Sequence, residues 1–405
     1  KISPQEHELT PLSAVGLTYQ SPDGNHLVTG KGDLPNTIPI DIPLNGKPVW
    51  IVAVPTQEGS LWAAVLEDGS IQANHVVDKT YSAVELGVNN LPVGMPPILT
   101  NQEGAYTLFP PISGSRSLVT HPIPLSGNYS FAYIGENGNL LLENGGETDI
   151  LEANALPDGR ILVDDNERLL FLSSPTTRYN HGIAGDDIEA ASITLVGTSL
   201  PPRVIREIPI PDGQVVEGIS PIWFDINADG QREIIVTVSD ANQGAQILIF
   251  NESGEQIAQG QPIGQGYRWR HQIAVAPFGP NGEIELVDVL TPHIGGVIEF
   301  FQLKGDQLVL VAQLRGYTSH VIGSRNLDMA AAGDFDGDGI VEILIPSQNL
   351  GSLALIQRTL DGVKVDWELD LGATLTTNLA AVTCPSGDIA VGIGLDSGVI
   401  RLWLP

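Results

Sequence analysis

Two acidic loops contain the residues whose types and spacing indicate chemistry most clearly. Residues 225–233 read DINADGQRE and residues 334–342 read DFDGDGIVE, so both follow the pattern D-x-D/N-x-D-G-x-x-E. Oxygen-bearing side chains at positions one, three and five of such a loop can converge on one point, and the glycine at position six permits the sharp turn. Oxygen ligands in this number suit Ca²⁺, because it is a hard cation.

We therefore predict two Ca²⁺ sites, each completed by the backbone carbonyl of position seven and the acid of position nine. The predicted ligands are Asp225, Asn227, Asp229, Gln231 and Glu233 in the first loop and Asp334, Asp336, Asp338, Ile340 and Glu342 in the second. The second loop has one more acid, so we expect it to bind Ca²⁺ more tightly. The alternative is a pair of Asx-rich turns without metal. An acid at position nine and an apolar strand after the loop argue against an EF-hand.

Both loops, together with their apolar flanks, resemble FG-GAP repeats of the VCBS type. The matching segments are residues 224–236 (FDINADGQREIIV) and residues 333–345 (GDFDGDGIVEILI). That family builds β-propellers like those of integrin α chains and holds Ca²⁺ in the turn between the first two strands of a blade. The resemblance implies this fold and this metal. It does not imply an activity, because the family includes adhesins, lectin-like modules and lyase scaffolds.

The remainder of the sequence indicates an all-β fold. Short β-rich runs alternate with Gly, Pro, Asn and Asp turns, and residues 277–285 and 379–391 repeat the frame of the acidic loops without their ligands. We predict a single β-propeller over residues 1–405 with about seven four-stranded blades. Six or eight blades are the alternatives, and a tandem of β-sandwiches is the third choice. An N-terminal strand, residues 16–20 or 26–29, should complete the last blade, so deleting residues 1–30 should lower the thermal stability sharply.

Composition limits the partners and the location. Acids outnumber bases 48 to 19, which gives a formal net charge of −29, so general electrostatics exclude binding to nucleic acid or to an anionic membrane. No apolar run is long enough for a transmembrane span, so we expect no direct membrane insertion. Loops of moderate affinity fill with Ca²⁺ outside the cytosol. We therefore expect a mature exported protein without its signal peptide, which is extracellular, on the cell surface or periplasmic.

Basic and aromatic residues gather at three places with a similar position in the repeat. The segments read RYNH at 178–181, RWRH at 268–271 and YTSH at 317–320, and each is predicted to lie where an innermost strand begins. The candidate residues for binding a sugar or a carboxylate at the channel mouth are Arg178, His181, Arg268, His271, Tyr317 and His320. Alternatively, each histidine hydrogen-bonds to nearby backbone and stabilises its turn. A metal site of three histidines is a further alternative.

No pattern of nucleophilic or zinc-dependent hydrolysis is present, so we name no catalytic residue. The sequence favours a non-enzymatic exported binding module, or a subunit of a cell-surface assembly, whose partner is a protein or a glycan. The alternative is a polysaccharide lyase or hydrolase that uses the His, Arg and Tyr residues at the channel mouth. In either case we expect binding on that face. Replacing Arg268 and His271 together by alanine should abolish it.

Overall fold

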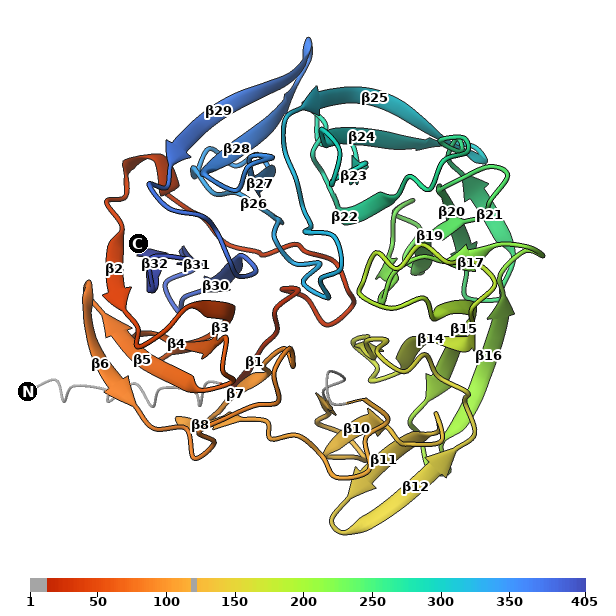
Figure 1. The fold of residues 1–405 in the computed structure, drawn as a ribbon, viewed down its shortest axis with the longest axis horizontal. Helices are drawn as coiled ribbons and strands as arrows, with labels where there is room; N and C mark the ends of the chain where they lie inside the picture. The colour runs from red at the N-terminus through yellow and green to blue at the C-terminus, as the bar shows by residue number, and fades with distance from the viewer. Residues whose placement is uncertain (1–12, 118–121) are drawn as a thin grey trace, which may run out of the picture.

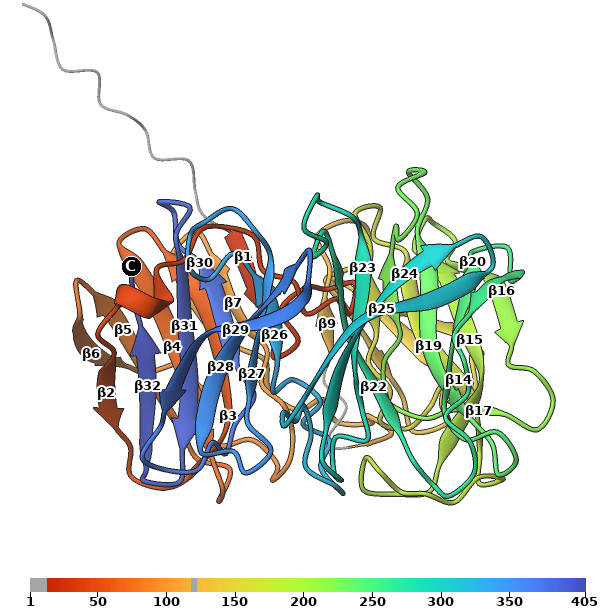
Figure 2. The same ribbon diagram turned by 90° about the horizontal axis from the view of Figure 1, so that it is seen from above.

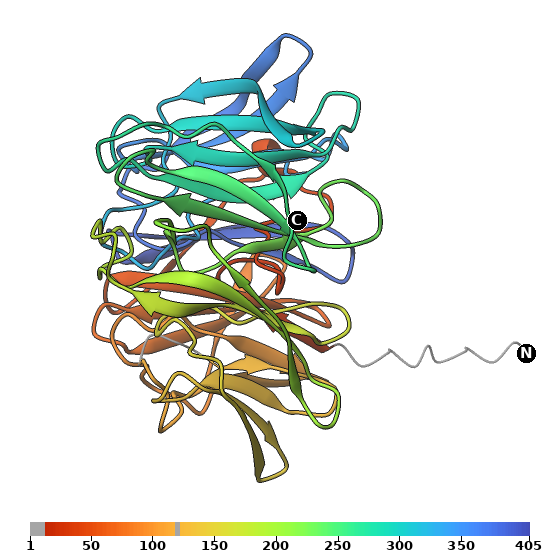
Figure 3. The ribbon, with the colours of Figure 1, turned by 90° about the vertical axis from the view of Figure 1, so that its right-hand side faces the viewer.

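The computed structural model describes residues 13–117 and 122–405. Their strands form eight antiparallel blades around a central axis (Figure 1). The molecule is a disc whose strands run between its two faces (Figures 2 and 3). The predicted all-β propeller is confirmed. The described blades number eight, which is one of the alternatives, and not the seven that the sequence favoured.

The first four blades are numbered in their order around the ring. Blade 1 contains β3 (Pro48–Thr56), β4 (Gly59–Leu66), β5 (Ile71–Val77) and β6 (Thr80–Val84). Blade 2 contains β1 (Ser13–Gly16), β7 (Leu99–Gln102) and β8 (Ala105–Leu108). Blade 3 contains β9 (Ile123–Pro124), β10 (Phe131–Ile134), β11 (Leu140–Asn144) and β12 (Glu147–Leu151). Blade 4 contains β13 (Leu162–Val163), β14 (Leu169–Thr176), β15 (Glu189–Gly197) and β16 (Arg203–Pro209).

The other four blades complete the ring. Blade 5 contains β17 (Val215–Val216), β18 (Ile222–Phe224), β19 (Glu233–Ser239), β20 (Gln246–Asn251) and β21 (Gln256–Gln259). Blade 6 contains β22 (Arg270–Ala276), β23 (Glu285–Leu290), β24 (Val297–Lys304) and β25 (Gln307–Arg315). Blade 7 contains β26 (Ala331–Gly333), β27 (Glu342–Pro346), β28 (Ser352–Thr359) and β29 (Gly362–Asp370). Blade 8 contains β30 (Ala380–Thr383), β31 (Ile389–Leu395), β32 (Val399–Trp403) and β2 (Ile40–Pro43).

Blade 8 combines both ends of the chain. Its outermost strand, β2, pairs antiparallel with β32 and follows a short 3₁₀ helix, η1 (Leu34–Asn36). The segments predicted for this role lie elsewhere, because Gly16 belongs to β1 in blade 2 and Leu27 bridges Ala332 in blade 7. β2 suits an outer edge, because Asp41 faces solvent, Ile42 is buried, and a proline at the end of an edge strand costs no ladder hydrogen bond.

The segment between β1 and η1, residues 17–32, crosses the centre of the ring (Figure 1). Its backbone bonds to the innermost strands of blades 4 to 7, and to the β30–β31 turn and the start of β31 in blade 8. The bonds join Pro22 to Val163, Asp23 to Trp223, His26 to Ile273 and Ala332, and Lys31 to Gly387 and Ile389. The cavity beside His26 and His271 has a volume of only about 20 Å³, which is room for about one water molecule. We call this segment the plug, because it runs across the central channel at whose mouth the sequence predicted a binding site.

The core lies between the blades, and burial follows distance from the axis. Strands near the axis contact a neighbouring blade on both faces, so β19, β22 and β31 are buried at every residue. The outermost strands β6, β12 and β16 are mostly exposed. Blade 3 was not counted as a separate repeat, because its strands have only two to five residues and the turn between β9 and β10 lacks the acidic frame of the other repeats. No helix in the described residues combines the length and apolar character needed to cross a membrane.

Candidate functional site

Both acidic loops occupy the same place in the fold. Residues 225–232 connect β18 to β19 in blade 5, and residues 334–341 connect β26 to β27 in blade 7. The glycine at position six has a positive φ in both, 85° at Gly230 and 89° at Gly339, which confirms why glycine is needed there. The turn between β22 and β23 in blade 6 is the third copy of this arrangement.

The second loop gathers its acids into a cluster. Asp334, Asp336, Asp338 and Glu342 each offer an oxygen, and these four atoms lie within 4.8 Å of one another. Glu342 is fully buried at the start of β27. Burial and the neighbouring aspartates raise the pKa of Glu342 to about 9, and burial raises that of Asp336 to about 6. These are the ligand types that a hard cation requires, and their mutual repulsion is what such a cation would relieve.

Backbone N–H groups orient the ligands of the second loop. Asp334 accepts from Gly337 at 2.7 Å and from Gly339 at 3.1 Å. Asp338 accepts from the N–H of Ile340, the residue at position seven, at 2.8 Å. These bonds keep the carboxylates turned into the loop, so the geometry exists before any ion binds.

The end of the plug and the start of η1 both bond to the second loop. The N–H of Gly32 donates to the carbonyl of Asp334 at 2.7 Å, and that of Leu34 donates to Phe335 at 2.8 Å. A Cβ on Gly337 would lie 2.5 Å from the carbonyl oxygen of Gly32, and Gly337 also has a φ of 82°. Position four of this loop must therefore be glycine.

The first loop occupies the same turn as the second loop but has different side-chain hydrogen bonds. The amide nitrogen of Asn227 donates to Glu233 at 3.1 Å, while its oxygen accepts from the N–H of Asp229 at 2.9 Å. Asp225 accepts from the N–H of Gly230 at 2.8 Å, and Asp229 from that of Gln231 at 2.8 Å.

The pKa of Glu233, the acid that closes the first loop, is raised less than that of Glu342. Burial raises the pKa of Glu233 to about 7. Within residues 13–117 and 122–405, only the second loop brings three or more acidic, His or Cys ligand atoms this close together.

The third turn shows how the same glutamate is used without a metal. Glu285 in blade 6 is fully buried and occupies the position of Glu233 and Glu342. It accepts from Arg358 of blade 7, at 2.9 and 3.2 Å, and from Gln302 at 2.9 Å. A guanidinium group thus supplies the positive charge here.

These partners were not predicted from the sequence. In blades 6 and 7 an amide side chain on the third strand faces the closing glutamate: Gln302 faces Glu285, and Gln357 lies 3.4 Å from Glu342. Gln357 also donates to Asp338 at 2.9 Å. These glutamines follow their glutamates by 17 and 15 residues, a spacing that was visible in the sequence.

The residues predicted for the channel mouth do not share one position in the fold. Arg268 and His271 lead into the innermost strand β22, and Tyr317 and His320 lie before β26, as expected. Arg178 and His181 instead lie between β14 and β15, the second and third strands of blade 4. The prediction failed there because the innermost strand, β13, has only two residues, too few to mark its place within the blade from the sequence.

Two of the three predicted histidines meet, but in the core. His271 stacks on Trp269 with ring centroids 4.8 Å apart, and His320 contacts the same ring at 5.2 Å. His271 bonds to the hydroxyl of Ser319 at 2.8 Å. His320 bonds to His293 and to the carbonyl of Ser324, both at 2.6 Å.

These histidines are uncharged at neutral pH. Burial lowers the pKa of His271 well below its ordinary value, and lowers that of His320 to about 4. The described histidines form no group of three with ligand atoms as close as those of the acidic cluster.

The remaining predicted residues are held by separate partners. His181 bonds to Glu217, and its ring lies 5.5 Å from that of the exposed Tyr267. Arg178 donates to the carbonyl of Gln214. Arg268 donates to the carbonyls of Ile263 and Gln265, at 2.8 and 3.1 Å. The six predicted residues therefore do not surround one open site.

Arg268 contributes instead to a groove between blades 5 and 6. The groove has a volume of about 650 Å³. One wall is the connection that follows β21, and the other is the face of β24 and β25 that carries Phe301, Leu310 and Arg315. Ile294, which is 75% exposed, lies at one end. Its size is that of an ordinary ligand-binding site.

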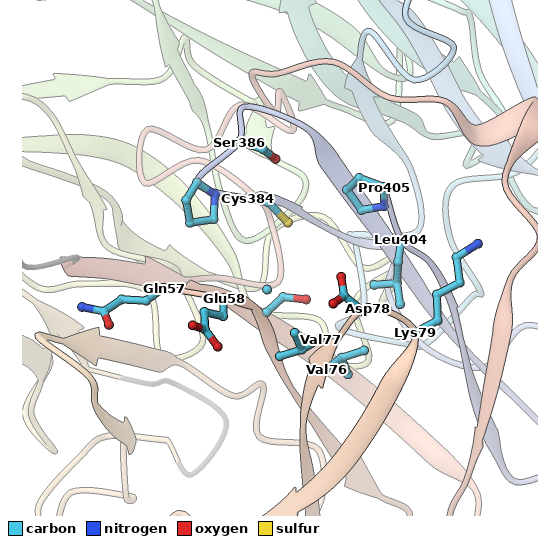
Figure 4. Close-up of a pocket in the computed structure, with 13 residues that line it drawn as sticks. Gln57, Glu58, Val76, Val77, Asp78, Lys79, Cys384, Ser386, Leu404 and Pro405 are labelled. Atoms are coloured by element: carbon cyan, nitrogen blue, oxygen red, sulfur yellow. The ribbon is translucent and has the colours of Figure 1, made fainter. Parts of the chain in front are cut away.

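A second cavity, of about 510 Å³, lies between blades 8 and 1 (Figure 4). Glu58 and Asp78 line one side, and Cys384 and Ser386 line the other. Burial and the nearby Asp388 raise the pKa of Cys384 to about 11, so its thiol is protonated at neutral pH and is not an activated nucleophile.

Solved structures share this fold. No model of a protein family matches the chain, and no curated protein matches its sequence. A europium-containing methanol dehydrogenase matches with a TM-score of 0.53 and 10% identity, over 93% of this chain and 89% of that chain. Sqt1 of Saccharomyces cerevisiae matches with a TM-score of 0.53 and 10% identity, over 93% of this chain and 100% of that chain. Likeness at this identity shows the fold alone, so the chain is a β-propeller, and its described residues include one acidic cluster able to hold a metal ion.

Proposed function

We propose that this protein is a Ca²⁺-stabilised β-propeller that acts outside the cytosol as a non-enzymatic binding module. Its partner is a protein or a glycan at the cell surface. The observation that carries the proposal is the groove between blades 5 and 6, where exposed apolar side chains lie beside arginines in a protein of net charge −29. An apolar surface flanked by a few fixed charges is typical of an interaction site.

We assign Ca²⁺ to both acidic loops, as loops of the FG-GAP type. The loop at 334–342 is the tighter site, because three aspartates crowd around a buried glutamate that forms no ion pair with a cation of the described residues. The loop at 225–233 is the weaker site, because Asn227 already satisfies Glu233. The role of the ion is structural. It holds the turn between the first two strands of a blade, and the plug that bonds to it.

The location follows from the metal. Loops of moderate affinity fill reliably where Ca²⁺ is millimolar, and this supports an extracellular, cell-surface or periplasmic protein. The packed histidines support a binding role over a catalytic one, because a general acid or base needs a pKa near the working pH and access to substrate.

A paired assay of binding and turnover tests the function. Ca²⁺-loaded protein is applied to a glycan array and to a native surface extract, and the same glycans are analysed for new chain ends after incubation. Retention of a defined partner without cleavage supports the proposal. Cleavage of a glycan by the purified protein, or failure to retain any glycan or protein, would overturn it.

A further inference from the structure

The groove exists because two neighbouring outer strands differ in length. β21 has four residues and β25 has nine, and they pair in parallel only at Gln259 and Gln307. After this pair, residues 260–263 follow β20 of their own blade, because the N–H groups of Gly260 and Ile263 donate to the carbonyls of Ile247 and Ala245. In the described part of the chain, no strand pairs with the outer edge of β25 beyond Gln307. Its free backbone groups therefore border an open groove.

The face of β25 toward this groove changes character along its length. Leu308 and Leu310 lie near the end that pairs with β21, and Leu310 is opposite Phe301 on β24. Arg315 lies at the other end, opposite Val297. Leu310 is 43% exposed, although it sits beside a nearly buried phenylalanine. The groove-facing side chains of β25 are therefore apolar at one end of the strand and cationic at the other.

The charges of the groove are divided into neutralised and free groups. Arg270 bonds to Asp288 and Glu299, both at 2.6 Å, so this buried guanidinium is already engaged by two carboxylates of the protein. Arg268 donates only to backbone carbonyls, and neither Arg268 nor Arg315 forms an ion pair with a described residue. Two cations therefore face this groove without acidic partners, in a chain where acids outnumber bases 48 to 19.

We propose that the groove binds an extended peptide segment of a partner protein as an added strand on β25. The groove-facing side chains of this segment are apolar beside Leu308 and Leu310 and acidic beside Arg315, within reach of Arg268. The inference rests on the proposed function and names the partner class. Main-chain hydrogen bonds to a free edge supply affinity, and the alternate side chains supply specificity.

The net charge of the protein does not oppose this partner at close range. Interactions between exposed charges are largely screened beyond about 8 Å at physiological ionic strength, so the two arginines dominate inside the groove. A long-chain carboxylate would match the same charges, but it would leave the free edge of β25 unpaired. The unpaired edge favours a peptide.

Fluorescence polarisation with labelled peptides of about ten residues tests the proposal, since this length matches β25. One half of each peptide has apolar residues at alternate positions and the other half has Asp or Glu, and both chain directions are synthesised. The controls have lysine in place of the acids, or a central proline that blocks strand pairing. We expect the acidic peptide of one direction to bind and both controls to bind at least about tenfold more weakly.

Matched variants locate the site. Leu310→Asp should weaken binding by about tenfold or more, because it places a charge against the apolar half of the peptide, whereas Val309→Asp should not. Val309 is a suitable control, because it is 38% exposed and points to the other face of the same strand. Arg268→Ala with Arg315→Ala should also weaken binding, and Arg203→Ala with Arg206→Ala, on the exposed strand β16, should not. His271, which is buried, is left unchanged.

The outcomes separate this inference from the function on which it rests. If the Leu310 variant and the double-arginine variant bind the peptide as well as wild type does, the groove is not the peptide-binding site. This holds even if the protein still retains a surface partner. If the protein binds decanoate but no peptide, and the arginine variants lose decanoate binding, the proposed peptide ligand is wrong. The ligand of the groove would then be a small amphiphile. If no partner of any kind is retained in the binding and turnover assay, the proposed function itself fails.

Discussion

The turn between the first two strands is built on one plan in blades 6 and 7, yet the same buried glutamate is neutralised in different ways. In blade 6, Glu285 receives the guanidinium group of Arg358. In blade 7, Glu342 faces three aspartates and the neutral amide of Gln357. The difference shows that one fold can place this buried glutamate either in an ion pair or in a cluster of acids. One blade takes a positive charge from the neighbouring blade, and the other leaves room for a metal ion.

Blade 5 lies between these cases. Asn227 donates to Glu233, and burial raises the pKa of Glu233 only to about 7, compared with about 9 for Glu342. The closing glutamate alone therefore does not define a metal site. The residue at position three decides whether the loop is satisfied internally or left with repelling charges.

The largest effect is expected where the arginine neutralises the glutamate. Glu285→Gln should reduce the free energy of unfolding by about 3 kcal/mol, because it leaves the buried Arg358 without a counter-ion. The loss should be the same with Ca²⁺ and with chelator. Denaturant unfolding measures it, and a loss that Ca²⁺ restores would show that blade 6 also holds a metal.

The corresponding change in blade 7 should have the opposite sign in the metal-free protein. The pKa of about 9 means that folding at pH 8 must protonate this carboxyl, and Glu342→Gln removes that cost. With chelator we therefore expect the variant to be more stable than wild type by on the order of 3 kcal/mol at pH 8. With saturating Ca²⁺ the order should reverse, because the variant lacks a ligand. Unfolding curves under the two conditions test both signs, and a variant that is destabilised in both would break the comparison.

The pH dependence of the metal-free protein should reveal the same group. The pKa of Glu342 is raised in the folded state, from 4.5 to about 9. The folded protein therefore binds more protons than the unfolded chain between these values, and its stability should fall as pH rises through this window. Glu342→Gln should flatten the slope, and Ca²⁺ should reduce it. Melting temperatures at pH 5 and pH 8 with chelator suffice, and a wild type that gains stability toward pH 8 would contradict this view.

The sequence predicted the features that depend on neighbouring residues and missed those that depend on contacts between distant residues. The acidic loops and their flanking strands are local patterns, so the sequence predicted the turns, the all-β fold and the candidate ligands. Arg358 lies 73 residues after Glu285 and reaches it across a blade boundary, so no local pattern marks the pair. The plug was missed for the same reason, because its bonds to distant inner strands determine its path. The groove depends on the unequal lengths of β21 and β25, and strand ends are poorly marked in a sequence.

Calorimetric titration of the chelated protein with Ca²⁺ tests the central claim most directly. We expect uptake in wild type with a tighter and a weaker site. Asp336→Asn should weaken the tighter site by on the order of tenfold, because it gives the second loop the amide of the first. Asn227→Asp should strengthen the weaker site by a similar factor. No Ca²⁺ uptake by wild type, or a tighter site that Asp336→Asn leaves unchanged, would contradict the claim that the crowded acids of residues 334–342 hold the metal.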